Sequence, residues 1–250
     1  MNTDADIAGV LGRFDDASPE LLNACELRRR VDRKYLLPKS LLKSLLALLH
    51  VDYRVVRSDG MLVAEYDTLY FDTRERQMYE DHRRGRFPRY KVRLRHHLDR
   101  QLSFLEIKSK QGLITSKARM LRVGSDSELD AEAFRFLEEH CPIPPALLVP
   151  RLSSAYRRLT LAGEATNERV TIDWGIEFHD GSRCERLPGV VIAEIKQPCY
   201  SNGSTAVRAF RTLGLREHAV SKYCLATARL APVRTNTFKP TMRIVERLSP

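Results

Sequence analysis

Charged and apolar side chains alternate in four segments of the sequence, and the charged ones are of the types that bind phosphate. The segments are 89–97, 102–109, 168–174 and 190–197. Side chains two apart on a β-strand share one face, so each segment predicts a strand with one charged and one apolar face. Any single one fits an ordinary half-buried strand with its charges in water. The four together favour a sheet that closes, with the charged faces lining a tunnel and helices covering the outside.

The charges on these faces indicate what such a tunnel would bind. Arg93 and Arg95 share one face, and the planar guanidinium fork of arginine matches phosphate oxygens. Glu106 and Glu194 stand among the cations, where they would repel phosphate unless lysines pair with them or a hard divalent cation bridges them. The pattern therefore predicts a polyanionic guest, with Mg²⁺ or Mn²⁺ as a possible bridge.

Length and composition exclude several classes of protein. The chain has 250 residues, a net charge of +10 and 43% hydrophobic residues, which is enough for a core; arginine supplies 32 of its 42 cations. It has no apolar run of the roughly 18 residues that a membrane span needs, and no signal-peptide pattern. Its five cysteines are scattered without a C-x-x-C pair, which argues against a zinc finger or a disulfide scaffold. We therefore expect a soluble, cytoplasmic protein.

The predicted elements describe an α+β protein with many strands adjacent in sequence. Helices are predicted at 18–27, 38–49, 127–140, where Ser127 would be the cap, and 204–213. Strands are predicted at 62–71, 89–97, 102–109, 116–123, 151–160, 168–174, 190–197 and 221–230. This order favours an antiparallel sheet or barrel over a doubly wound parallel sheet. We expect one domain over 1–230 and a solvated basic tail over 231–250.

Nine short motifs, in order, resemble the VTC domain family of polyphosphate polymerases, a branch of the triphosphate tunnel metalloenzyme (CYTH-like) superfamily. They are Arg33-Lys34-Tyr35, Tyr70-Phe71-Asp72-Thr73, Lys91-Val-Arg93-Leu-Arg95, Phe104-Leu-Glu106-Ile-Lys108, Ser116-Lys117-x-Arg119, Tyr156-x-Arg158, Arg169-Val-Thr-Ile-Asp173, Ala193-Glu194-Ile-Lys196 and Ser221-Lys222-Tyr223. The resemblance implies an eight-stranded antiparallel β-barrel tunnel with flanking helices. It also implies binding of ATP and inorganic polyphosphate, tripolyphosphate or pyrophosphate, with Mn²⁺ or Mg²⁺ as cofactor.

The resemblance also implies roles for particular residues. The phosphate-binding set is Lys34, Arg93, Arg95, Lys108, Lys117, Tyr156, Arg158, Arg169, Lys196, Ser221 and Lys222. Glu194 is the expected metal ligand, and Arg93, Arg95, Lys108 and Glu194 are the expected catalytic residues. The implied reaction transfers the γ-phosphoryl group of ATP to a growing polyphosphate chain. Because Arg157 adjoins Arg158, a shift of one residue would reverse the predicted faces.

One departure and two alternatives accompany this interpretation. The hydrolase branches begin with E-x-E-x-K, whose two glutamates hold metal, whereas this chain has Arg30-x-Asp32-x-Lys34, which favours the polymerase branch. A triphosphate or polyphosphate hydrolase on the same tunnel remains one alternative. A non-catalytic module that binds polyphosphate is the other. Nucleic acid is disfavoured, because Phe87 and Tyr90 are the aromatic residues among the basic ones in 83–100.

Overall fold

One antiparallel sheet organises the protein. The computed structural model describes residues 7, 9–26, 30–112, 114–122 and 128–249. Eight strands follow one another in the order β1 (Val31–Pro38), β10 (Val190–Gln197), β8 (Arg169–His179), β7 (Val149–Gly163), β3 (Val63–Asp72), β4 (Arg89–His97), β5 (Leu102–Gln111) and β6 (Ile114–Arg122). Two short strands extend it, β2 (Tyr53–Val55) beside β7 and β9 (Cys184–Leu187) beside β8.

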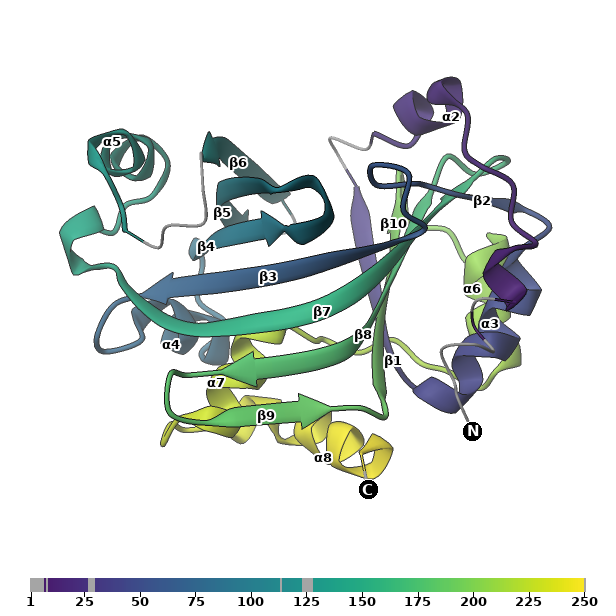
Figure 1. Ribbon diagram of the computed structural model, residues 1–250. Coiled ribbons are helices and arrows are strands. Elements are labelled where there is room, and N and C mark those ends of the chain that lie inside the picture. The colour runs from purple at the N-terminus through teal and green to yellow at the C-terminus, as the bar shows by residue number, and fades with distance from the viewer. Residues whose placement is uncertain (1–6, 8, 27–29, 113, 123–127, 250) are drawn as a thin grey trace.

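The sheet curls strongly, so that β1 and β10 stand across the direction of β3 and β7 (Figure 1). Among the described residues, the end strands β1 and β6 form no ladder with each other, so the curl is a half-barrel with a concave and a convex face. The predicted fold class, an eight-stranded antiparallel β-barrel tunnel with flanking helices, is confirmed in its sheet and helices. The expected closure is incomplete, because β1 and β6 form no ladder within the described residues.

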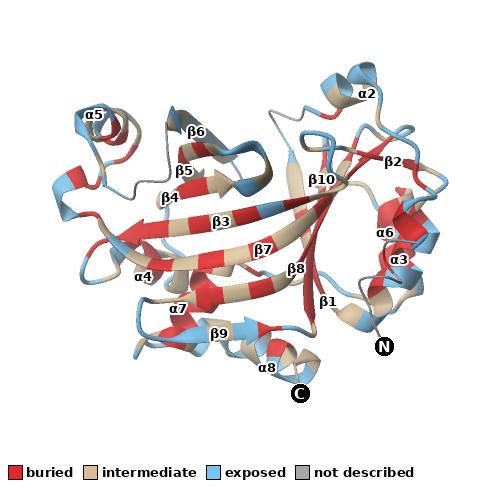
Figure 2. Cartoon of the chain, in the orientation of Figure 1, coloured by how far each residue is buried: buried red, intermediate tan, exposed pale blue. Residues whose placement is uncertain are grey.

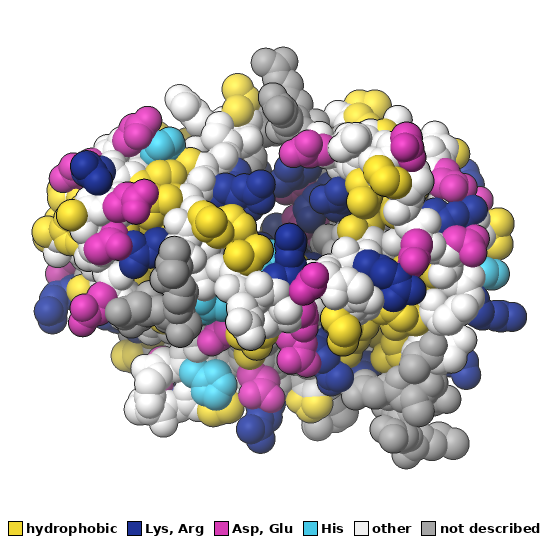
Figure 3. Space-filling model, turned by 45° about the horizontal axis from the view of Figure 1, so that its top comes forward, with side chains coloured by type: hydrophobic (Ala, Val, Ile, Leu, Met, Phe, Trp, Pro, Cys, Tyr) yellow, Lys and Arg dark blue, Asp and Glu magenta, His cyan; other side chains and the backbone are white. Residues whose placement is uncertain are grey.

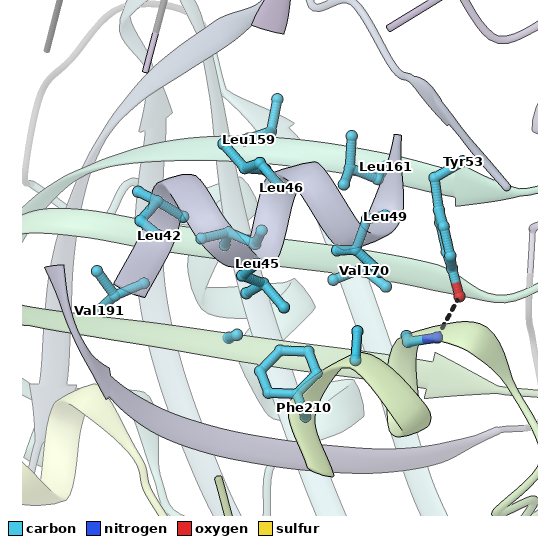
Figure 4. Packing of buried hydrophobic residues seen from close by; sticks show 14 of the residues in the cluster. Leu42, Leu45, Leu46, Leu49, Tyr53, Leu159, Leu161, Val170, Val191 and Phe210 are labelled. Carbon is cyan, nitrogen blue, oxygen red and sulfur yellow. Dashed lines mark hydrogen bonds between the residues drawn. The ribbon is translucent and has the colours of Figure 1, made fainter. Parts of the chain in front are cut away.

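Helix α3 (Leu42–Leu49) covers the convex face beside α6 (Thr205–Thr212). Its buried residues, Leu42, Leu45, Leu46 and Leu49, recur at helical spacing and form one apolar stripe. Figure 4 shows this stripe against side chains of β7, β8 and β10 and against the ring of Phe210 from α6. Each leucine that is fully buried contributes about 1.5 to 3 kcal/mol, so this packing holds α3 on the convex face of the sheet.

Two further helices cover the other end of the molecule. Helix α5 (Ala131–His140) packs Ala133 and Leu137 on the outer residues of β4 and β5. Helix α4 (Gln77–Arg83) follows β3 through a turn in which Asp72 accepts hydrogen bonds from the backbone N–H groups of Thr73, Met78 and Tyr79, at 2.7, 2.9 and 3.0 Å. The short helix α2 (Pro19–Ala24) lies near the N-terminus.

Helix α7 (Lys222–Leu230) and helix α8 (Lys239–Leu248) cover one end of the concave face. The α7 side chains pack against Tyr70, Tyr156 and Ile192 from three strands, and burial is nearly continuous around this helix (Figure 2). The hydroxyl of Tyr223 also donates to the carboxylate of Asp72. The helix therefore narrows one end of the half-barrel and leaves the charged strand segments beyond it uncovered.

Most predicted elements are present, and three predictions are wrong. Residues 221–230 form α7 rather than a strand, because burial on all sides leaves no polar face and therefore no helical period to read. The tail predicted to be solvated contains α8, whose Val245 is completely buried. Asp130, not Ser127, caps α5 by accepting from the N–H of Ala133; Ser127 itself lies outside the described residues. No local pattern in the sequence predicted β2, β9 or α4.

None of the helices within the described residues has the length and apolar character needed to span a membrane.

Candidate functional site

The predicted charged rows lie side by side on the concave face. Strand pairing sets Arg93 opposite Glu106 and Arg158 opposite Asp173. Cross-strand neighbours share a face, so the rows from β1, β10, β8 and β7 lie on the same face as those from β4, β5 and β6. The uncharged Tyr66, Thr68 and Tyr70 of β3 lie between the two groups. Figure 3 shows a hollow with Lys and Arg side chains around it. Sequence spacing therefore identified the correct face of β4, β5, β8 and β10.

A cavity of about 960 Å³ lies between this face and the helices at its end. Lys34, Lys91, Lys108 and Ser221 are among its lining residues. Lys34 also donates to the backbone carbonyl of Val220 at 3.3 Å, which joins β1 to the start of α7. The cavity thus lies where the cationic strand residues meet the N-terminus of α7.

Glu106 holds three of the predicted cations together. Its carboxylate lies 2.6 Å from Arg93 Nη2 and 3.7 Å from Arg95 Nη1, and it pairs closely with Lys117. Burial alone would raise the pKa of Glu106, but the charges of Arg93, Arg95 and Lys117 hold it well below its usual value. The acid is therefore ionised at neutral pH and fixes the three cations in place.

Asp173 organises a second group on β7, β8 and α7. Arg158 donates to both carboxylate oxygens, and Lys222 pairs closely with one of them. The Lys222 ammonium also lies 4.2 Å from the centre of the Tyr156 ring, a cation–π contact. Burial opposes ionisation of Asp173, but Arg158 and Lys222 lower its pKa below the usual value. The ion pair with Lys222, which lies 49 residues after Asp173 in the sequence, connects α7 to the sheet.

Glu194 is held more loosely than the other two buried acids. Its oxygens lie 3.6 Å from Lys34 Nζ and 3.4 Å from Lys196 Nζ. Burial lowers the pKa of Lys196 to about 8, although Glu194 acts to raise it. The charges of Lys196 and Lys34 outweigh burial and keep the pKa of Glu194 well below its usual value. These longer contacts leave the carboxylate oxygens of Glu194 available to a further cation.

Lys108 reaches across the opening between the two ends of the sheet. Its Nζ on β5 lies 3.4 Å from Asp32 Oδ2 on β1, and Asp32 Oδ1 accepts from Arg30 Nε at 2.9 Å. Burial lowers the pKa of Lys108, and the nearby Lys34 lowers it further. In the Arg30-x-Asp32-x-Lys34 motif, which differs from the E-x-E-x-K of the hydrolase branches, the aspartate thus serves as the counter-charge of Lys108.

Two predicted residues, Arg169 and Ser221, have no ionic partner among the residues that the structure describes. Arg169 lies opposite Lys196, and among the described residues no carboxylate lies within 4.0 Å of its guanidinium, whose Nε has no hydrogen-bond acceptor. Ser221 caps α7, where its hydroxyl accepts from the N–H of Cys224 at 3.4 Å. Within the part of the chain that the structure describes, the charge of Arg169 is consequently not neutralised by a carboxylate.

Sequence reasoning missed Lys91 and His82 as lining residues. Lys91 shares the face of Arg93, so strand periodicity contained this signal. Within the described residues it has no acid within 4.0 Å, and burial together with Lys34 and Lys108 lowers its pKa to about 7. His82 comes from α4, for which the sequence offered no pattern; burial and neighbouring cations lower its pKa to about 2.

A curled antiparallel sheet with a cationic concave face defines the class of triphosphate tunnel folds. The chain belongs to the VTC domain family, because the model of that family matches residues 29–231. The family predicted from the nine motifs is thereby confirmed. No curated protein sequence matches the chain significantly.

One solved structure supports the fold, and two others are similar to the chain at a lower TM-score. A proposed adenylyl cyclase from Hippeastrum, described as having a dominant triphosphatase activity, has a TM-score of 0.52 and 13% identity over 82% of this chain and 98% of that chain. A proposed adenylate cyclase from Vibrio parahaemolyticus has a TM-score of 0.46 and 16% identity over 79% and 97%. A protein from Pyrococcus horikoshii OT3 has a TM-score of 0.46 and 11% identity over 80% and 99%. At 13% identity, the likeness to the Hippeastrum structure concerns the fold alone.

Proposed function

We propose that this protein is a polyphosphate polymerase that transfers the γ-phosphoryl group of ATP to a growing inorganic polyphosphate chain. The observation that carries the proposal is the convergence of cations from seven strands and α7 on one concave face. Alternate residues on a strand are about 6.6 to 6.8 Å apart, so the cations recur along a path that suits a linear chain of phosphates. Membership of the VTC domain family supports the same substrate.

The chain's own residues bind and orient both substrates in this proposal. Arg93, Arg95 and Arg158 offer paired N–H donors to phosphate oxygens, whereas the lysines act as point charges. The proposed phosphate-binding set is Lys34, Arg93, Arg95, Lys108, Lys117, Tyr156, Arg158, Arg169, Lys196, Ser221 and Lys222. A polyanion entering the site competes with Glu106, Asp173 and Glu194 for these cations, so the acids keep the empty site neutralised and ordered.

The proposed reaction needs no nucleophile from the protein. An oxygen of the acceptor's terminal phosphate attacks the γ-phosphorus, and the bond from that phosphorus to the β–γ bridging oxygen breaks. ADP leaves with the bridging oxygen and its electron pair, and the acceptor is one phosphate longer. Arg93, Arg95 and Lys108 hold the two phosphates in line and neutralise the charge on the transferring group.

Glu194 has the properties of an anchor for the divalent cation that the family implies. Its two ammonium contacts are 3.4 and 3.6 Å long, whereas Glu106 and Asp173 each accept at 2.6 Å from an arginine. Mg²⁺ and Mn²⁺ commonly bind through one or two carboxylates and the phosphates of the substrate, which suits a single available acid. When bound, such an ion supplies neutralisation of the phosphate oxygens.

Incubation with ATP and Mn²⁺ or Mg²⁺, followed by separation of phosphate products on a gel, tests the proposal. We expect wild type to produce phosphate chains and Arg93→Ala and Glu194→Ala to produce few or none. Release of inorganic phosphate without chains would identify a hydrolase on the same site. Tripolyphosphate binding without either product would identify a binding module, and undiminished chains in both variants would contradict the assigned site.

A further inference from the structure

The hairpin of β8 and β9 carries three potential metal ligands away from the concave site. Glu177 and His179 are two apart on β8, and Cys184 on β9 is the direct cross-strand partner of His179. Asp173 faces the concave side, but Gly175 has a φ of 61° and the register with β7 shifts there. Beyond this irregularity Ile176 is buried with the concave-side cluster. Glu177 and His179 consequently point to the outer face.

The three ligand atoms are already close to the arrangement of a tetrahedral metal site. Cys184 Sγ and His179 Nε2 are 3.8 Å apart, and Glu177 Oε2 and His179 Nε2 are 3.7 Å apart. All three atoms lie within 4.8 Å of one another. Zinc bonds of about 2.3 Å to sulfur and about 2.0 to 2.2 Å to nitrogen and oxygen give ligand–ligand separations of about 3.4 to 3.6 Å at tetrahedral angles. Small side-chain rotations would complete the site without moving the backbone.

The surroundings of Glu177 leave one of its oxygens free for a metal. Arg186, two residues after Cys184 on β9, places Nε 3.2 Å from Glu177 Oε1. This contact orients the carboxylate and directs Oε2 toward His179, as supporting residues commonly do around metal ligands. On the opposite face of the strand, Ile176 and Phe178 are completely buried, so the backbone that carries the ligands is held in place.

We propose that Glu177, His179 and Cys184 form a binding site for Zn²⁺ or a similar thiophilic divalent transition metal. The thiolate and the carboxylate balance the two charges of the ion, and a fourth position stays open to water. A thiolate–imidazole pair selects such metals over Mg²⁺ and Mn²⁺, which prefer oxygen ligands. The site therefore differs in metal preference from the one proposed at Glu194. The bound ion would connect β9 to the end of β8, the strand that also carries Asp173.

Cobalt titration of the full chain tests the proposal, because Co²⁺ bound to a thiolate gives a sulfur-to-metal charge-transfer absorption. The chain is first stripped of metal and kept reduced. We expect the absorption in wild type, its loss in Cys184→Ser, and displacement of Co²⁺ by Zn²⁺. His179→Ala and Cys184→Ser should each weaken Zn²⁺ binding by at least about tenfold, measured by competition with a chromophoric chelator.

Two control variants separate this site from the rest of the chain. Cys199→Ser removes the other exposed cysteine, and Glu194→Ala removes the proposed anchor in the concave site. Both should retain the cobalt absorption and the wild-type Zn²⁺ affinity. Absence of the absorption in wild type, or equal Zn²⁺ affinity in wild type and Cys184→Ser, would overturn the proposal whatever the outcome for polyphosphate synthesis.

Discussion

Arg158 donates from Nε and Nη2 to the two carboxylate oxygens of Asp173, at 2.6 and 2.7 Å, and both side chains are largely buried. Lys222, on α7, forms an ion pair with the same carboxylate. A buried charge without its partner is strongly destabilising, so this group ties α7 to the sheet only while all its members are charged. The same cations are those that a phosphate chain would approach.

Asp173→Asn should therefore lower stability and strengthen the response to a polyanion. The variant leaves Arg158 and Lys222 without their counter-charge, and we expect a loss of about 3 to 5 kcal/mol in the free energy of unfolding, measured in urea. Tripolyphosphate should raise the melting temperature of the variant more than that of wild type. Glu164→Gln is the control, because Glu164 pairs with Arg54 at a half-exposed position and should change stability by under about 1 kcal/mol. Equal stability of Asp173→Asn and wild type would contradict this view of the cluster.

The sequence predicted on which face of its strand each charged side chain lies, but not which side chains form ion pairs with one another. Alternation in β4, β5, β8 and β10 was sufficient to place Arg93 and Glu194 on the concave face. The register of β7 with β8 resolves the choice between Arg157 and Arg158: Arg158 faces Asp173, whereas Arg157 lies over the Trp174 ring on the other side. Strand periodicity is local, and for this reason it could be read from the chain alone.

The rest of the site depends on contacts between distant segments. Lys222 reaches Asp173 only because 221–230 forms a helix, and the sequence predicted a strand there. The approach of Lys108 to Asp32 depends on the curl that brings β5 near β1. Neither the order of strands in the sheet nor this curl can be predicted from the spacing of residue types along the sequence. The domain bounds 1–230 and 231–250 and the cytoplasmic location stay predictions.

Replacing Arg93 by lysine should impair the proposed reaction although the charge is kept. The guanidinium of Arg93 donates from both Nε and Nη2 to Glu106, and an ammonium cannot reproduce this fork. We expect kcat/KM for ATP to fall by about 10²- to 10³-fold, the usual effect of losing one oriented donor to the transition state. Arg211→Lys is the matched comparison, because Arg211 is exposed on α6, outside the concave face, and should stay within a few-fold of wild type. Equal losses in the two variants would show that position on the concave face does not matter.

Leu45→Ala should reveal how far the scaffold under the site depends on α3. Leu45 is completely buried between the helix and the convex face, so truncation leaves a cavity and should lower the free energy of unfolding by about 2 to 5 kcal/mol. Leu48 lies on the same helix but is 41% exposed, and Leu48→Ala should have a much smaller effect. Urea unfolding of both variants measures the difference, which would vanish if α3 were only loosely attached.

Glu194→Gln should change the metal requirement more than phosphate binding. The amide keeps the shape of the side chain but is a weaker ligand, so the Mn²⁺ concentration for half-maximal activity should rise by about 10- to 100-fold. Metal-free tripolyphosphate should bind the variant at least as tightly as wild type, because a negative charge has been removed beside Lys34 and Lys196. Calorimetry in a chelating buffer measures this binding. An unchanged Mn²⁺ requirement would place the metal elsewhere.

Lys91 should make polyanion binding depend on pH near neutrality. Burial lowers its pKa from an ordinary value of 10.5 to about 7 in the folded chain, so it is protonated below pH 7 and loses its charge above. Between about pH 7 and 10.5 the unfolded chain binds this proton and the folded chain does not. By linkage, Lys91 thus makes stability rise with pH across that window. Phosphate binding has the opposite dependence, because a neutral amine attracts no anion.

Lys91→Arg isolates this effect, since a guanidinium keeps its proton over the whole range. Tripolyphosphate itself gains negative charge as pH rises, and Lys196 titrates near 8, but both contributions are common to the two proteins. The ratio of the wild-type to the Lys91→Arg dissociation constant should therefore rise above pH 7, by at most about tenfold per pH unit. Calorimetry at pH 6, 7, 8 and 8.5 measures the ratio. A ratio that stays constant would mean that Lys91 retains its proton, and that burial and the neighbouring Lys34 and Lys108 do not lower its pKa enough to affect binding.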